Sequence, residues 1–150
     1  MKLNFNVNEN VLIPRADTEI LVEEALKIYD ENYKDKEISI LDLCTGSGAI
    51  GVSLARYIQN SVVYVSDISK PAIDTAIENA NLNGVYRKMI FKYADLFKEY
   101  VDDDFNYMGE RLSNLEFDMI CSNPPYITKE EMRYASRRSK KRTRTCFIWR

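Results

Sequence analysis

A glycine-rich turn between an apolar strand and a helix restricts the fold of this chain more than any other feature. Residues 38–43 (ISILDL) have the composition of a buried strand, and Gly46, Gly48 and Gly51 follow them in the pattern G-x-G-x-x-G. Glycine is needed where a backbone must approach a ligand without a β-carbon in the way, and the next helix presents free N–H groups. Asp67, at the end of the next apolar run, stands near the acidic position of a nucleotide-binding site. Turns of this kind also occur without a nucleotide, so the ligand stays open at this point.

Strands and helices alternate along the chain around this turn. Apolar runs predict strands over 3–7, 38–43, 61–68, 89–93 and 117–121. Helical spacing predicts a helix capped by Asp17 or Thr18 after the first strand and a helix over 49–57 after the second. A third helix, after the strand over 61–68, is opened by Ser69 and Pro71 and closed by Asn83-Gly84. This alternation predicts an α/β fold on a parallel sheet with right-handed crossovers. The carboxyl ends of such strands share one edge, where we expect Gly46, Asp67, Asp95 and Asn123 to meet.

The composition excludes several kinds of chemistry. The chain has no histidine, and Cys44, Cys121 and Cys146 do not have the spacing of metal ligands, so we expect no metal site. Without histidine, a His-dependent triad is excluded, and catalysis must rest on positioning, hydrogen bonding or a cofactor. No apolar run approaches the roughly 20 residues of a membrane span and no signal peptide follows Met1, so we expect a reduced, cytoplasmic protein without membrane contact.

The motif Asn123-Pro124-Pro125-Tyr126, directly after the last expected strand, is the most specific in the chain. Two prolines fix the backbone, remove two N–H donors and leave carbonyl acceptors. The side-chain oxygen of Asn123 and the carbonyl of Pro124 can accept both hydrogens of one NH2 group, so that its nitrogen lone pair points at an electrophilic methyl. Tyr126 offers a flat face to a planar amide or base. A rigid turn alone would explain the prolines, whereas the position opposite the glycine turn favours catalysis by orientation.

Asp42, inside the strand before the glycine turn, indicates the charge of the ligand. A carboxylate at this place is unfavourable beside a pyrophosphate, as in a nicotinamide site, and favourable beside a cation. The sequence therefore favours S-adenosylmethionine, which carries a sulfonium and an ammonium group.

Four segments carry a further likeness: residues 11–19 (VLIPRADTE), 41–50 (LDLCTGSGAI), 67–69 (DIS) and 122–127 (SNPPYI). Together they resemble the HemK/PrmC family, the glutamine methyltransferases of peptide-chain release factors. The resemblance covers about residues 3–131. It implies a class I S-adenosylmethionine-dependent, Rossmann-like fold and methylation of the glutamine side-chain amide in the Gly-Gly-Gln motif of a release factor.

The resemblance also implies roles for individual residues. It assigns the methionine part of the cofactor to Cys44, Thr45, Gly46, Ser47 and Gly48, the ribose to Asp67, the adenine to Asp95 and Leu96, and the target amide to Asn123, Pro124, Pro125 and Tyr126, with Asn123 also beside the cofactor. Cys44 stands where the family more commonly has glycine, which costs the turn backbone freedom.

Charge divides the chain into a body and a tail. The formal net charge is -2, but residues 1–132 contain all 23 acidic side chains and 13 basic ones, for a charge of -10, while residues 133–150 contain eight basic and no acidic side chains. We therefore expect an incomplete methyltransferase core over 1–132 and a basic tail over 133–150. The family's sheet has seven strands in the order 3-2-1-4-5-7-6, so a core that ends after the fourth strand would leave that strand at an open edge.

The tail has three interpretations: a nucleic-acid-binding arm in which Phe147 and Trp149 stack on bases, a disordered end, or a product of a shifted reading frame. With suitable synonymous codons, removing one base from a back-translation of residues 134–150 gives MLPEEVKKEPELALFG. That sequence is similar to what the family has after its Asn-Pro-Pro-Tyr turn, so we favour the shifted frame.

Two further functions are compatible with the motifs. Adenine or guanine amino groups can occupy a similar turn, which would make the chain a nucleic-acid amine methyltransferase, or the chain is a non-catalytic, cofactor-binding truncation product. The acidic body argues against nucleic acid as a direct partner, and the partner that the resemblance implies is a release factor.

Overall fold

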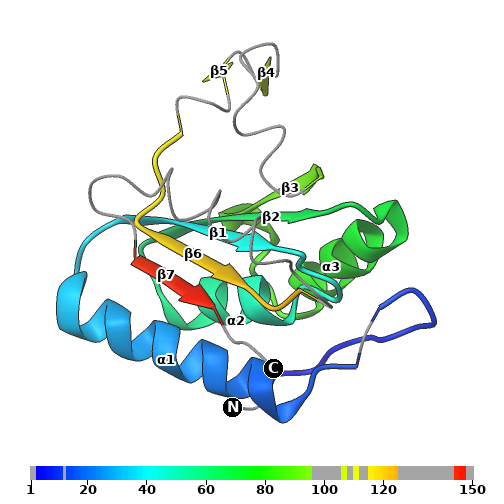
Figure 1. Ribbon diagram of the computed structural model, residues 1–150, viewed down its shortest axis with the longest axis horizontal. Coiled ribbons are helices and arrows are strands. Elements are labelled where there is room, and N and C mark those ends of the chain that lie inside the picture. Colours follow the sequence, from blue (N-terminus) through cyan, green and yellow to red (C-terminus); the bar gives the residue numbers. More distant parts are fainter. Residues whose placement is uncertain are drawn as a thin grey trace.

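A parallel sheet forms the centre of the protein. The computed structural model describes residues 3–11, 13–95, 106–107, 110–111, 115–124 and 144–147 of the 150-residue chain. Within them, the strand order of the main sheet is β3-β2-β1-β6-β7 and every neighbouring pair is parallel (Figure 1). The strands are β1 (Ile38–Leu43), β2 (Ser61–Asp67), β3 (Met89–Tyr93), β6 (Met119–Ser122) and β7 (Arg144–Phe147), and a separate antiparallel pair consists of β4 (Asn106–Tyr107) and β5 (Glu110–Arg111).

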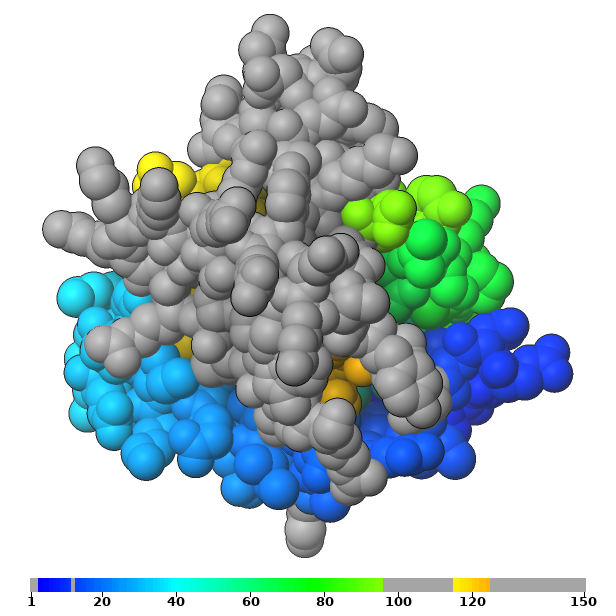
Figure 2. All heavy atoms as spheres, in the orientation of Figure 1, coloured from blue at the N-terminus to red at the C-terminus, as the bar shows by residue number. Residues whose placement is uncertain are grey.

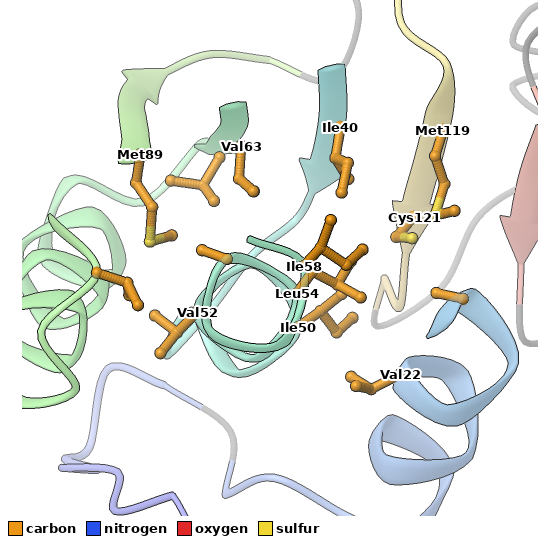
Figure 3. Packing of buried hydrophobic residues seen from close by; sticks show 14 of the residues in the cluster. Val22, Ile40, Ile50, Val52, Leu54, Ile58, Val63, Met89, Met119 and Cys121 are labelled. Atoms are coloured by element: carbon orange, nitrogen blue, oxygen red, sulfur yellow. The ribbon is translucent and has the colours of Figure 1, made fainter. Parts of the chain in front are cut away.

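Three helices pack against one face of this sheet. They are α1 (Ala16–Asn32), α2 (Ala49–Tyr57) and α3 (Lys70–Leu82), with a short 3₁₀ turn, η1 (Tyr86–Lys88), before β3. Helix α2 lies in the middle, and Figure 3 shows its Leu54, with Ile58 directly after the helix, between Ile40 and Met119 of the strands and Val22 of α1. All five side chains are fully buried, so this cluster fixes α1 and α2 against the sheet.

The opposite face of the sheet carries a second apolar cluster. Leu41, Leu43 and Ile120 are buried there, and Tyr64 and Phe117 meet edge to face with ring centroids 5.2 Å apart. Strand β1 therefore contributes apolar side chains to both faces of the sheet. Burial on both faces explains why its sequence is a continuous apolar run rather than an alternating one.

Several elements have the bounds expected from the sequence. Strands β1 and β3 and helix α2 begin and end at the predicted residues. Helix α3 is capped by Ser69, whose side chain accepts a hydrogen bond from the N–H of Ala72, and it ends at Asn83 before Gly84, which has a φ of 70°. The start and end signals of α3 predicted from the sequence are therefore confirmed.

The strand predicted over residues 3–7 is wrong. This segment is extended but is paired with side chains of α3 instead of a neighbouring strand, and the two lie side by side in Figures 1 and 2. The hydrogen-bonded pairs are Asn4 with Asn83, Asn6 with Asn79 and Asn8 with Thr75. Four residues of helix rise about 6 Å and two residues of extended chain about 6.6 Å, so every fourth helical residue meets every second residue of the segment.

The cap predicted for the first helix is also wrong. Helix α1 begins at Ala16 after Arg15, with no hydrogen bond from a capping side chain, and Thr18 lies inside its first turn. The backbone N–H of Thr18 is satisfied by the carbonyl of Arg15 at 2.9 Å, so the turn closes without a capping side chain.

The open edge expected beside β6 is occupied. Four residues of the basic tail form β7, which pairs in parallel with β6 from Met119 opposite Arg144 to Ser122 opposite Phe147. An unpaired strand edge presents free N–H and C=O groups that another segment can satisfy, which is the physical reason for this correction. Residues 133–143 and 148–150 of the tail lie outside the described residues.

Candidate active site at the carboxyl edge of the sheet

The glycine turn connects β1 to α2 through three residues in the left-handed region. Cys44, Gly46 and Gly48 have φ values of 57°, 55° and 80°. For Cys44 this conformation costs about 1 kcal/mol more than it would for glycine. A β-carbon at Gly48 would lie 3.0 Å from that of Ala76, so this glycine also allows α3 to approach the turn.

Asp42 holds the turn from beneath. Its Oδ2 accepts hydrogen bonds from the Thr45 hydroxyl at 2.6 Å and from the N–H of Gly51 at 2.9 Å. Its Oδ1 is buried and has no hydrogen-bond partner among the described residues. Burial raises the pKa of Asp42 to about 7, against the two hydrogen bonds, which lower it. The carboxylate is thus a costly buried group that a nearby cation would favour in its charged form.

Asp67 ties the glycine turn to the next crossover. Its Oδ2 accepts from the N–H of Gly46 and its Oδ1 from the N–H of Ser69, both at 2.9 Å. A carboxylate has about four acceptor positions, so two remain for a ligand hydroxyl. The side chain fixes the turn and keeps acceptor capacity at the sheet edge.

The electrostatic environment of Cys44 shows how negative this edge is. Burial, together with the carboxylates of Asp67, Asp42 and Asp95, raises the pKa of the Cys44 thiol to about 12, against a lowering hydrogen bond with Ser122. Three carboxylates from three different strand ends thus act on one point. Such a site favours a cationic ligand over an anionic one.

Asn123 follows β6 and reaches the same edge. Leu43 and Ser122 are register partners, and the Ser122 hydroxyl donates to the carbonyl of Leu43 at 2.9 Å, so Asn123 and Cys44 leave neighbouring strand ends. Asn123 is half-buried, and its Nδ2 donates to Oγ1 of Thr18 at 3.2 Å. The described chain continues through Pro124.

The structure brings together most of the residues singled out from the sequence. Asp67 is the last residue of β2, and Gly46, Asp95 and Asn123 follow the carboxyl ends of its parallel neighbours β1 and β3 and of β6 beside β1, as expected. Leu96, Pro125 and Tyr126 lie outside the described residues, so their assignments stay predictions.

Two residues of this region had no signal of their own in the sequence. Asn79 of α3 is fully buried, and its Nδ2 donates to the carbonyls of Ser47 in the glycine turn and of Asn6. Thr18 looked like a helix cap but contacts Asn123. A polar residue in the middle of an apolar helix face is the one pattern that could have drawn attention to Asn79.

The part of the chain that the structure describes has neither a metal-binding cluster nor a membrane-spanning helix. No group of three or more His, Cys, Asp or Glu side chains there could hold a metal ion. None of its helices is long and apolar enough to cross a membrane.

Curated release factor glutamine methyltransferases are similar to this chain over most of its length. A release factor glutamine methyltransferase from Fusobacterium nucleatum is 43% identical over 129 residues, which are 86% of this chain and 32% of that protein. The chain spans less than half the length of the curated relatives it matches.

Solved structures share the fold at low sequence identity. The METTL16 methyltransferase domain superposes with a TM-score of 0.71 at 16% identity, over 95% of this chain and 56% of that one. An RNA methyltransferase from Salinibacter ruber in complex with S-adenosyl-L-homocysteine gives 0.59 at 17% identity, over 89% and 72%. The fold is therefore the α/β, Rossmann-like fold of class I methyltransferases. Residues 17–139 match the family model of the methyltransferase small domain, and the chain belongs to that family.

Proposed function

We propose that this chain carries the core of an S-adenosylmethionine-dependent methyltransferase that modifies the side-chain amide nitrogen of glutamine in the Gly-Gly-Gln motif of a release factor. The observation that carries the proposal is the position of Asn123, at the strand end next to the glycine turn. The 43% identity to a release factor glutamine methyltransferase supports the choice of substrate. Release factors act in the cytoplasm, where we place the reaction, with no membrane and no direct nucleic-acid partner.

The residues at the sheet edge fit this cofactor. The unpartnered Oδ1 of Asp42 and the surrounding carboxylates suit a ligand with an ammonium and a sulfonium group. A β-carbon at Gly46 would meet nothing within 4 Å, so the turn is open on that side. Asp67 keeps acceptor capacity for ribose hydroxyls.

Each cofactor-binding residue has one part of the ligand to hold. We assign the methionine part to residues 44–48, the ribose to Asp67, and the adenine to Asp95 and Leu96. When bound, the cofactor supplies an electrophilic methyl group.

Asn123 and Pro124 would orient the acceptor amide. The two oxygens, Oδ1 of Asn123 and the Pro124 carbonyl, accept the two N–H hydrogens of the target glutamine and turn its nitrogen lone pair out of conjugation. Pro125 keeps the backbone rigid, and Tyr126 packs its ring against the planar amide. After methyl transfer the amide nitrogen carries a positive charge and is strongly acidic, so it can release its extra proton to water without a histidine, which the chain lacks.

Methyl transfer from labelled cofactor to a release factor tests this function directly. We expect the wild-type chain to transfer the methyl group to a release factor with Gly-Gly-Gln, and not to the same factor with Gly-Gly-Ala. Asn123→Ala should lower transfer by about a hundredfold or more while calorimetry gives an unchanged cofactor affinity. Unchanged transfer by Asn123→Ala would refute the assigned role, and cofactor binding without any wild-type transfer would identify a binding-only product. Transfer to RNA or DNA instead would identify a nucleic-acid amine methyltransferase.

We also propose that residues 133–150 are translated from a shifted reading frame, so that the core domain covers residues 1–132. The support is the family-like sequence MLPEEVKKEPELALFG obtained by back-translation of this part of the chain. Sequencing the coding DNA tests it: codons for residues 134–150 that cannot encode this second frame would rule the idea out.

A further inference from the structure

We propose that Thr18 is a positioning residue for the reaction: it orients the side-chain amide of Asn123 so that Oδ1, and not Nδ2, faces the target amide. The proposal rests on the proposed function of Asn123. It concerns a contact between residues 105 positions apart, in which Nδ2 of Asn123 donates to Oγ1 of Thr18 at 3.2 Å.

Thr18 is held firmly enough to act as a fixed reference. Its side chain is only 9% exposed, and it lies in the first turn of α1, whose next turn buries Leu21 and Val22 in the core against α2. A β-branched side chain has few χ1 rotamers in a helix, which limits where the hydroxyl can point. Since Thr18 does not cap α1, its hydroxyl oxygen is available to Asn123.

An asparagine at such a site needs a partner of this kind. The two ends of its amide have nearly the same shape and opposite hydrogen-bonding character, so a 180° turn replaces an acceptor with a donor. The target is an NH2 group, and a turned Asn123 would present its own NH2 to it. Committing Nδ2 to Thr18 favours the orientation in which Oδ1 is left for the substrate.

A matched set of variants separates orientation from mere packing. Thr18→Val has nearly the shape of threonine and lacks the hydroxyl, whereas Thr18→Ser keeps it. Thr75→Val is the control, because it removes a threonine hydroxyl that donates to Pro71 and accepts from Asn8, away from Asn123. We expect Thr18→Val to lower kcat about fivefold, the effect of one hydrogen bond, with the cofactor Kd unchanged. Thr18→Ser should stay within about twofold of wild type, as should Thr75→Val.

A second measurement does not depend on activity. The side-chain ¹⁵N–H2 resonance of Asn123 should show protection from hydrogen exchange in the wild type and in Thr18→Ser, and lose it in Thr18→Val. Should Thr18→Val not fold, Thr18→Ala removes the same hydroxyl without a branched side chain to fit, and the same results are expected of it.

The outcomes keep the two proposals apart. A normal kcat in Thr18→Val, or an equal loss in Thr18→Ser, would overturn the role of Thr18, and so would an Asn123 amide unprotected in the wild type. No transfer by the wild type, with the Asn123 amide protected, would overturn the proposed function while leaving the Thr18 contact demonstrated.

Discussion

The two halves of the candidate site, the glycine turn and Asn123, differ in how many hydrogen bonds hold them in place. The glycine turn is held from beneath by Asp42, from the side by Asp67 and from α3 by Asn79, all through backbone groups of the turn or of the helix that follows it. Among the residues that the structure describes, Asn123 has one side-chain hydrogen bond, to Thr18 of α1. The difference teaches that the cofactor half is shaped before any ligand arrives, whereas the substrate half depends on how α1 packs.

In the glycine-turn half, we expect the titration of Asp42 to have the largest effect on the free energy of unfolding. Its pKa is raised from 3.8 to about 7 in the folded chain, so the folded state keeps a proton that the unfolded state loses. The free energy of unfolding should therefore fall as pH rises from about 4 to 7 and level off above, by up to about 4 kcal/mol.

The variant Asp42→Asn isolates this contribution. Its amide oxygen can still accept from Thr45 and Gly51, and it carries no charge to bury. Urea unfolding at pH 4 and pH 8 should give similar stability for both proteins at the lower pH and a more stable variant at the higher one. Parallel pH profiles for the two proteins would show that Asp42 does not titrate in this range.

Asp67→Asn tests whether the turn needs both carboxylate oxygens. An amide has one acceptor, so either the N–H of Gly46 or that of Ser69 would face an NH2 group, at a cost of about 2 kcal/mol. Asp118→Asn is the control, because Oδ2 of Asp118 accepts from the N–H of Ser39 and an amide oxygen can replace it. Thermal unfolding of the two variants measures the difference, and equal losses would contradict the account.

Gly51→Ala tests the close packing beneath the turn. A β-carbon there would lie 2.5 Å from Cγ1 of Val65 and 3.1 Å from Oδ2 of Asp42. We expect a net loss of about 1 to 2 kcal/mol, since overpacking outweighs the better helix propensity of alanine. Gly46→Ala should lower the free energy of unfolding by only about 1 kcal/mol, because the space there is open and the cost comes from the left-handed backbone conformation. Chemical denaturation of both variants ranks them, and the reverse order would break the argument.

Asn83→Ala should have the smallest effect. It removes the hydrogen bonds from Nδ2 of Asn83 to the carbonyls of Asn4 and Asn79, at the exposed end of the N-terminal segment, together worth about 0.5 kcal/mol. Cofactor affinity and methyl transfer should not change, because Asn83 contacts the carbonyl of Asn79 and not the Asn79 side chain that bonds to the glycine turn. A loss of transfer in this variant would show that the end of α3 helps to hold the glycine turn.

The features that depend on residues close together in the chain could be predicted from the sequence. The apolar run of β1, the glycines after it and the Ser69-to-Gly84 boundaries of α3 each act within a few residues, so pattern and propensity suffice. The polar carboxyl ends of the strands were predictable because parallel strands with right-handed crossovers must bring them to one edge.

The remaining features depend on partners distant in the chain. Residues 3–7 have the alternation of a strand, but their hydrogen-bond partners are side chains 73 to 79 residues away on a helix. Thr18 is acceptable as a cap by its residue type, and only the folded position of Asn123 gives it another role. Local preference cannot distinguish these outcomes, since tertiary contacts decide them.

The match between α3 and the N-terminal segment makes the segment sensitive to its own length. The backbone groups of Asn4 and Asn6 are bonded to the side chains of Asn83 and Asn79, while the side chain of Phe5 between them packs against the core. Deleting or inserting one residue at this place would turn these backbone groups away from their partners and move Phe5 out of the core. Point substitutions here should be tolerated far better than a change of length by one.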